Sequence, residues 1–294
     1  MIKTLFECLV HVRYSNDENV TGGKWMCALD TLIDHKPCVV YSFGSQGMVD
    51  FEEELMETHP TCNVHVFDPS MTHDQLESLE QRLNTKHDKQ RIWFHQYGLA
   101  PRSGVYDTAG RFRCQDNPYS PLLQAHWAKM KNLVTDWSSL GRLMRGSWQI
   151  RLFQNSTGPI DNGCRLMAID DIMAGLGHDW VDIWKMDIEG GEIDFIADLG
   201  ARPEQMRFTQ IILEVHYAAR PEKPPATDSA QLLQTLQDNN YHSFFLEVNI
   251  WNAPLTCVEL AYIKIDPVTG LVINSPDRQK QMNSSKPVRG WKST

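Results

Sequence analysis

Short apolar runs alternate along this chain with longer stretches in which apolar residues recur at helical spacing. The first such run, residues 38–43, is almost continuously apolar, as expected for a strand covered on both faces, and it ends at Gly44. Residues 50–56 follow with acidic side chains first and apolar ones at helical spacing, which predicts the start of a helix. An alternation of this kind indicates a parallel sheet.

The alternation continues to residue 265. We expect further strands at residues 64–67, 91–95, 181–187, 209–216, 243–248 and 257–265, and helices at 72–83, 166–176, 193–199 and 228–239. The last two strands leave no room for a helix between them, so they should pair antiparallel. Five βα units that end in such a pair favour an α/β, Rossmann-like class I S-adenosylmethionine methyltransferase fold. This fold has seven strands, mostly parallel, with a C-terminal antiparallel hairpin and helices on both faces.

One domain, residues 1–270, accounts for this pattern, and a polar tail, 271–294, follows; we expect the chain to be irregular or disordered from Asp266 onwards. Residues 101–164 interrupt the alternation with two short helical candidates, 122–134 and 138–144. Their tryptophans and tyrosines could form a lid over an acceptor, or could bury the insertion against the sheet.

Composition narrows the class of protein. The chain has 294 residues, 41% of them hydrophobic, and a formal net charge of −9, which argues against a nucleic-acid partner. No apolar stretch is long enough for a membrane span, and the run at residues 5–10 does not look like a signal peptide. Seven singly spaced cysteines suggest buried thiols and a cytoplasmic setting, although Cys38 and Cys62 could be bridged in a secreted protein.

Two groups of residues at strand ends point to a nucleoside. Gly44, Ser45 and Gly47 follow the first strand, where a turn without bulky side chains lets the backbone approach a ligand. Asp68 closes the next strand, where an acid can accept hydrogen bonds from ribose hydroxyls. An ordinary turn and a helix cap would also explain them. The glycines do not make a full GxGxxG, which weighs against a pyrophosphate cofactor such as NAD; S-adenosylmethionine carries no phosphate.

A second group lies at the ends of the two central strands. Asp187, Glu189 and Glu192 form a short acidic run, and such acids repel one another unless a cation, a metal or a ligand ammonium group pairs with them. Glu189 and Glu192 could instead only decorate a helix N-terminus. Glu214 and His216 share one face of the following strand, because side chains alternate with period two.

Several short motifs, in this order, resemble a eukaryotic methyltransferase-like family related to the FkbM-type S-adenosylmethionine-dependent methyltransferases. They are residues 22–27, 40–47 with 50–52, 67–69, His95 with 97–99, 176–178, 185–192, 213–216 and 257–259. The resemblance spans residues 20–265 except for the insertion. Ile188, Gly191 and Ile193 depart from it, since many relatives carry Cys, Ala or an aromatic residue there.

The resemblance implies methyl transfer from S-adenosylmethionine to oxygen in a small molecule or glycan. It assigns Gly44, Ser45 and Gly47 to the amino-acid end of the cofactor. Further implied cofactor residues are Asp68 and Pro69 at the ribose, Gly98 and Leu99 near the adenine, and Asp187 and Glu189 near the methionine amino group or the acceptor.

A hydroxyl acceptor must lose a proton. We expect His216 to be the general base, because imidazole titrates near neutrality, with Glu214 orienting it or Asp187 replacing it. A rival assignment makes Asp187 and Glu214 ligands of Mg²⁺ or Mn²⁺. Two other functions stay open: a catalytically silent binding domain with this fold, and an NAD-dependent oxidoreductase.

Overall fold

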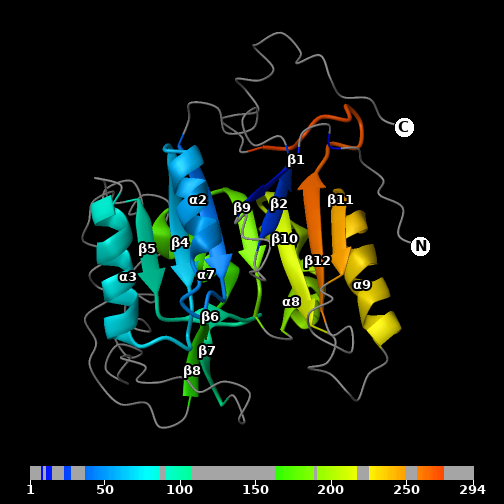
Figure 1. Ribbon diagram of the computed structural model, residues 1–294. Coiled ribbons are helices and arrows are strands. Elements are labelled where there is room, and N and C mark those ends of the chain that lie inside the picture. Colours follow the sequence, from blue (N-terminus) through cyan, green and yellow to red (C-terminus); the bar gives the residue numbers. More distant parts are fainter. Residues whose placement is uncertain are drawn as a thin grey trace.

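The main sheet has seven strands in the order β11-β12-β10-β9-β3-β4-β5. The computed structural model describes residue 8 and residues 11–14, 23–27, 37–86, 91–107, 163–188, 191–216, 225–248 and 257–274. The strands of this sheet are β3 (Cys38–Phe43), β4 (Cys62–Phe67), β5 (Ile92–His95), β9 (Val181–Met186), β10 (Phe208–His216), β11 (Tyr241–Val248) and β12 (Cys257–Lys264). Pairing is parallel from β10 to β5, and β12 runs antiparallel to both β10 and β11. The expected class I methyltransferase sheet is therefore confirmed (Figure 1).

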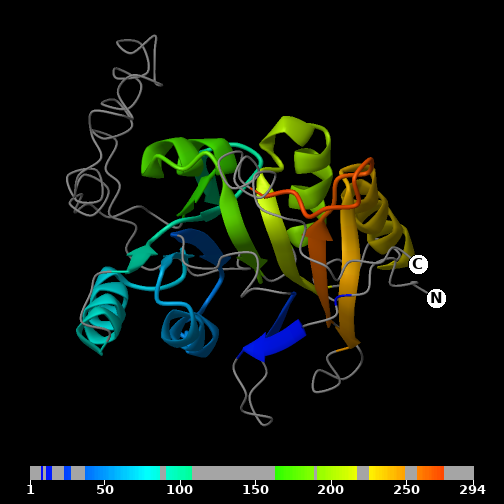
Figure 2. The same cartoon turned by 90° about the horizontal axis from the view of Figure 1, so that it is seen from above.

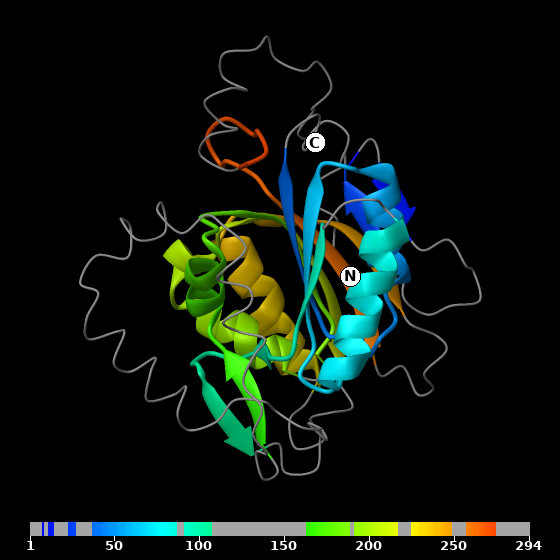
Figure 3. The ribbon, with the colours of Figure 1, turned by 90° about the vertical axis from the view of Figure 1, so that its left-hand side faces the viewer.

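Helices cover both faces of this sheet (Figures 2 and 3). They are α2 (Asp50–Thr58), α3 (His73–Lys86), α7 (Ile169–Leu176), α8 (Glu192–Gly200) and α9 (Pro225–Asp238), with a short 3-10 turn, η1 (Pro203–Gln205). One face carries α2 and α3, and the other carries α7, α8 and α9. Each face buries its own apolar cluster, so the strand ends between the layers are held on both sides.

A β-hairpin that the sequence pattern did not predict lies on the same face as α2 (Figure 2). It consists of β1 (His11–Tyr14) and β2 (Lys24–Cys27), paired antiparallel. The buried Gln210 amide of β10 accepts from the Cys27 N–H at 2.9 Å and donates to the Cys27 carbonyl at 2.8 Å. Trp25 stacks on Phe245 of β11 with ring centroids 4.5 Å apart. These contacts hold β2 against β10 and β11.

Two disulfides correct the expectation of unpaired cysteines. Cys8 is bonded to Cys27 in β2, and Cys38 is bonded to Cys62. Cys38 and Cys62 are direct partners in the register of β3 and β4, with Cα atoms 4.4 Å apart, which is within bonding range. The possible Cys38–Cys62 bridge is therefore the pairing found. Cys257 is buried and belongs to neither disulfide.

Three further differences concern the connections. Leu166 and Met167 belong to β8 (Gly163–Met167), so the helix expected from residue 166 begins only at Ile169. With β6 (Gly98–Leu99) and β7 (Gly104–Asp107), β8 forms a separate three-stranded sheet, which lies at the bottom of Figure 3. Most of the expected insertion, including both helical candidates, lies outside the described residues.

The chain turns back on itself directly after β12. Ile265 bridges to Val272, Asp266 N–H donates to the Leu271 carbonyl at 2.8 Å, and Val272 is buried. Residues 266–274 thus form a turn with one isolated bridge and no helix or strand, and residues 275–294 lie outside the described part. Among the helices described, none is long and apolar enough to cross a membrane.

Candidate active site

A tight turn after β3 meets the end of β9. Gly44 has φ +75°, and a Cβ atom there would lie 1.7 Å from the Asp187 carbonyl oxygen, so only glycine allows this approach. Gly47 also has positive φ, +84°. The Asp187 N–H donates to the Phe43 carbonyl at 3.0 Å, which holds the two strand ends together. The predicted glycine turn and the predicted acid Asp187 are thus direct neighbours.

Asp68, at the end of β4, holds this turn from the other side. Its Oδ2 accepts from the N–H of Ser45 at 2.9 Å and of Gln46 at 2.5 Å, and its Oδ1 accepts from the N–H of Ser70 at 2.9 Å. The residue is 1% exposed. Both oxygens of the predicted ribose ligand therefore already have partners, and its evident role here is to fix the conformation of the turn.

A buried ion pair between Lys185 and Glu52 contacts the backbone of the same turn. Lys185 of β9 lies 3.6 Å from Glu52 of α2, and its ammonium donates to Ser42 Oγ at 3.3 Å and to the Gly44 carbonyl at 3.4 Å. Ser42 Oγ in turn donates to Glu52 at 2.5 Å. All three side chains are buried, so each polar group depends on the others for its partners.

Four charged side chains converge at the ends of β9, β10 and β12. The Lys24 ammonium, from β2, is hydrogen-bonded to Glu259, lies 3.2 Å from Glu214 Oε2 and lies 3.9 Å from Asp187 Oδ2. Glu214 and Glu259 face each other directly in the register of β10 and β12. Two carboxylates that face each other on paired strands repel one another unless a cation lies beside them, and the Lys24 ammonium is that cation.

The pKa values of this cluster diverge. Burial raises the pKa of Asp187 to about 6, with Lys24 and Lys185 opposing the change. Burial likewise raises the pKa of Glu259 to about 8 despite Lys24. Burial alone would also raise the pKa of Glu214, but Lys24 and hydrogen bonds to its carboxylate hold it well below the ordinary value. Of the paired acids, Glu214 therefore carries the negative charge and Glu259 keeps a proton more readily.

Lys24 itself stays charged. Burial alone would lower the pKa of its ammonium, but Glu259, Asp187 and Glu214 together raise it above the ordinary value. A deeply buried cation with acidic neighbours on three strands is a fixed part of the electrostatics of the site.

His216, at the end of β10, completes this cluster. Its Nδ1 lies 3.1 Å from Glu192 Oε1, and its Nε2 lies 3.8 Å from both Asp187 Oδ1 and Glu214 Oε1. Glu192 is the first residue of α8, is fully buried, and also accepts from the Ile188 N–H at 3.0 Å. A carboxylate at Nδ1 favours a proton on that nitrogen, while Nε2 faces Asp187 and Glu214.

The predicted catalytic residues Asp187, Glu214 and His216 thus lie together, whereas other predicted residues lie elsewhere. Gly98 and Leu99 are buried in β6, where they pair with Leu166 and Met167 of β8. A Cβ atom at Gly98 would lie 3.0 Å from the Pro69 ring. Glu189 lies outside the described residues.

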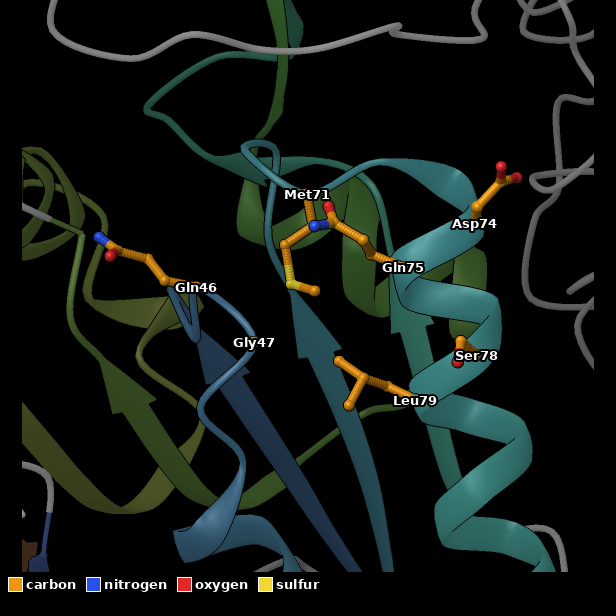
Figure 4. Close-up of a pocket in the computed structure, with 7 residues that line it drawn as sticks. All are labelled: Gln46, Gly47, Met71, Asp74, Gln75, Ser78 and Leu79. Atoms are coloured by element: carbon orange, nitrogen blue, oxygen red, sulfur yellow. The ribbon is translucent and has the colours of Figure 1, made fainter.

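A pocket of about 440 Å³ opens between the glycine turn and α3 (Figure 4). Its lining joins Gln46 and Gly47 to residues on or just before α3: Met71, Asp74, Gln75, Ser78 and Leu79. Figure 4 shows the Met71 side chain between the turn and the helix. The pocket therefore adjoins the predicted cofactor turn without including the acidic cluster.

A metal ion fits this donor set poorly. Among the described residues, Glu214, His216 and Cys257 offer ligand atoms within 4.8 Å of one another, which is a usable spacing. Asp187 and Glu214, the predicted Mg²⁺ or Mn²⁺ ligands, however, both face the Lys24 ammonium. A divalent ion would have to bind beside a buried positive charge, so we derive no catalytic step through a metal.

Lys24 and Glu259 are the site residues that the sequence reasoning missed. Each is a charged residue in a strand whose other positions are largely apolar, residues 24–27 and 257–264. A charge in such a strand must find a buried partner, which is a signal that a sequence alone offers. The identity of the partner follows only from the strand register and from the position of the hairpin.

Comparison with known proteins gives a family. A family model described as a methyltransferase domain matches residues 2–117 and 146–264, well over half of the chain. A search of curated proteins found no match. S-adenosylmethionine, the cofactor expected from the sequence, is the methyl donor of such a domain.

Solved structures with a similar arrangement of elements include two fibrillarins and an O-methyltransferase family 2 protein. The Methanococcus jannaschii fibrillarin pre-rRNA processing protein shares 6% identity at a TM-score of 0.37, covering 78% of this chain and 67% of its own. Aeropyrum pernix fibrillarin with natively bound S-adenosyl-L-methionine shares 7% sequence identity at a TM-score of 0.33, and the match covers 78% of this chain and 67% of that one. An O-methyltransferase family 2 protein from Planctomyces limnophilus, in complex with apigenin, shares 7% sequence identity at a TM-score of 0.32. The match covers 79% of this chain and 51% of that one.

Likenesses this distant do not bear on the substrate, whereas the family model matches both halves of the main sheet and the hairpin. The chain belongs to this methyltransferase-domain family.

Proposed function

We propose that this chain transfers the methyl group of S-adenosylmethionine to a hydroxyl oxygen of a small molecule or sugar. The observation that carries the proposal is His216, whose Nε2 faces the carboxylates of Asp187 and Glu214 at the end of the sheet that also holds the glycine turn. A kinship with the FkbM-type enzymes belongs to the same proposal.

The residues of the chain then have distinct tasks. When bound, S-adenosylmethionine supplies an electrophilic methyl group, which the acceptor oxygen takes as the carbon–sulfur bond breaks. His216 Nε2 takes the hydroxyl proton, while Glu192 holds the opposite ring nitrogen at 3.1 Å. The imidazolium that forms is stabilised by Asp187 Oδ1 and Glu214 Oε1, each 3.8 Å away.

The partly exposed Asp187 carboxylate also suits the cofactor. It is 24% exposed and adjoins the glycine turn, so it can face the positive charge of the methionine ammonium or sulfonium group. We assign Gly44, Ser45 and Gly47 to the amino-acid end of the cofactor. Asp68 and Pro69 are assigned to the ribose, and Gly98 and Leu99 to the surroundings of the adenine. Since both oxygens of Asp68 already accept hydrogen bonds, ribose hydroxyls would have to share them.

Thermal unfolding with S-adenosylmethionine and with its demethylated product tests the cofactor assignment. A ligand that binds only the folded state must raise the Tm, so both compounds should raise it and NAD should not. We expect Asp68→Ala to lose the shift and His216→Ala to keep it while losing turnover. A shift with NAD alone would instead favour the oxidoreductase alternative, and no shift at all would favour a silent binding domain.

The acceptor class needs its own experiment. A mass-labelled methyl group, supplied on the cofactor and traced in an extract separated into small molecules, glycans, protein and RNA, identifies the product. We expect the label among hydroxyl-bearing small molecules or glycans. Label in RNA or protein would contradict this part of the proposal and leave the methyltransferase assignment intact.

The two disulfides favour an oxidising compartment. The cytoplasmic setting expected from the sequence depended on unpaired thiols, whereas Cys8–Cys27 and Cys38–Cys62 are bonded. Non-reducing peptide mapping of the protein isolated from its own cells should recover both linked peptides. Recovery of four alkylated thiols would restore the cytoplasmic interpretation.

A further inference from the structure

The Lys24 side chain lies where a cation is needed, between the ends of three strands. It is 1% exposed and reaches Glu214 Oε2 at 3.2 Å, Asp187 Oδ2 at 3.9 Å and Glu259 through a hydrogen bond. A buried charge is tolerated only when it is paired and hydrogen-bonded, and an ammonium has three N–H groups to donate. Three carboxylates around it meet this requirement.

The two acids that face His216 Nε2, Asp187 and Glu214, divide their oxygens between Lys24 and His216. Asp187 presents Oδ2 to Lys24 and Oδ1 to His216 Nε2, and Glu214 presents Oε2 to Lys24 and Oε1 to the same nitrogen. Lys24 therefore determines which oxygens remain to face the imidazole. A metal held by these two acids would occupy the same position between the strand ends.

A rigid element brings Lys24 to this position. It is the first residue of β2, whose last residue, Cys27, is bonded to Cys8 and held through both backbone groups by Gln210 of β10. Because the hairpin is fixed to the sheet at the far end of β2, the ammonium is placed by the fold and not by a flexible loop.

We propose that the Lys24 ammonium is the resident cation of this site. It takes the place that a divalent metal would take between Asp187 and Glu214, and it positions these carboxylates for His216, so that methyl transfer needs Lys24 and no metal ion. The part concerning catalysis rests on the proposed function, whereas the part concerning the cation does not. Lys24 is a positioning residue, since it acts through Asp187 and Glu214.

Metal binding measured without cofactor or acceptor tests the cation assignment. MnCl₂ is added to the wild-type protein and to Lys24→Met, a variant of similar length without charge, and free Mn²⁺ is followed by electron paramagnetic resonance. We expect no binding by the wild type and one equivalent bound by Lys24→Met. Lys24→Arg, which keeps the positive charge, is the matched control and should bind none.

ZnCl₂, followed by competition with a coloured chelator, forms a second arm because His216 and Cys257 are ligands that zinc prefers. Stoichiometric Mn²⁺ or Zn²⁺ on the wild type, lost in Asp187→Asn or His216→Ala, would overturn the proposal. A folded Lys24→Met variant that binds neither ion would also overturn it, because the vacated position would then not be a cation site.

Removal of Lys24 leaves three acids together, so Lys24→Met could fail to fold. The double variant with Lys24→Met and Glu259→Gln loses one acid together with the ammonium. It replaces the single variant Lys24→Met in the same metal-binding experiment. For catalysis, we expect Lys24→Met to lower kcat at least tenfold with little change in KM for the cofactor, and Lys24→Arg to recover part of kcat. A wild-type enzyme that a chelator inactivates and Mn²⁺ restores would refute metal independence. The Tm shift with cofactor reports separately on the proposed function.

Discussion

At the scale of single residues, Gly44 allows the glycine turn after β3 to contact Asp187 at the end of β9. It has positive φ, and its Cα hydrogens face the Asp187 carbonyl, with no room for a methyl group. Gly177, which ends α7, has nearly the same φ, +72°, but nothing lies within 4 Å of the position of its Cβ atom. The two glycines therefore separate the cost of backbone conformation from the cost of close approach.

We predict that Gly44→Ala destabilises the protein far more than Gly177→Ala. The conformational cost of a left-handed alanine is about 1–2 kcal/mol and applies to both variants. Gly44→Ala must in addition move β9 away from the turn, which places it among severely destabilising changes of about 4 kcal/mol or more. Urea unfolding measures both values. Equal values for the two variants would show that the turn and Asp187 are not in contact.

The same scale shows what a sequence can tell about a site. Asp187, Glu214 and His216 were found because they lie at the ends of predicted parallel strands, and such ends converge at one edge of a sheet. Lys24 was not found, because it lies at the start of a strand and its partners are 163 or more positions away along the chain. Asp68 was found, but only the structure shows both its oxygens turned to the neighbouring backbone.

At the scale of elements, the β1–β2 hairpin is where prediction failed. The central strands and helices were predicted to within a few residues, because each is a continuous run with its own period. The hairpin strands have four residues each and mix charged with apolar side chains, HVRY and KWMC, so neither forms an apolar run. The sequence predicts a helix at Leu166 and Met167 because the apolar pattern of β8 continues without a break into α7.

A prediction at this scale concerns the bond between the hairpin and the residues before it. Cys8→Ser should lower the free energy of unfolding by about 2–4 kcal/mol, since the bond to Cys27 closes a loop with a sequence separation of 19. Loosening β2 should also reduce turnover, because Lys24 then reaches its three acids less well. Unfolding in urea and initial rates measure the two effects.

Cys62→Ser is the control for the hairpin prediction, because it breaks the other disulfide, which joins two strands that also pair through their backbones. It should cost stability and leave Lys24 in place, so turnover per folded molecule should be spared. If Cys62→Ser lowers turnover as much as Cys8→Ser does, the hairpin has no special link to the site.

At the scale of the whole molecule, the two faces of the sheet bury different kinds of polar groups. The strand ends hold the charged cluster around Lys24, whereas the face under α7 holds His65 and His178 beside Tyr41, with His95 against His65. His65 Nδ1 lies 3.1 Å from His95 Nε2, and His178 Nδ1 lies 2.7 Å from the Tyr41 hydroxyl. Burial lowers the pKa of His95 to about 3 and of His178 to about 4, and that of His65 well below its ordinary value.

These two groups make stability depend on pH in opposite directions. A histidine with a lowered pKa binds protons more readily when unfolded, so its contribution is complete above pH 6.5 and is lost as the pH falls towards the folded pKa. Asp187 and Glu259, whose pKa values are raised, bind protons more readily when folded, so they favour the folded state more as the pH falls through about 8 to 4. The wild-type protein should therefore show a shallow pH dependence in this range.

Single variants should separate the two opposing dependences of stability on pH. Each pH unit within the window of one group changes the free energy of unfolding by about 1.4 kcal/mol, so between pH 7 and pH 5 His178→Gln should lose about 2 kcal/mol less stability than the wild type. Glu259→Gln should change the pH dependence in the opposite sense and lose more on acidification. Urea unfolding at several pH values measures both slopes, and His73→Gln, at the exposed start of α3, is the control that should follow the wild type. Variants whose stabilities all run parallel to the wild type from pH 7 to pH 5 would show that neither the histidines nor the acids are buried as described.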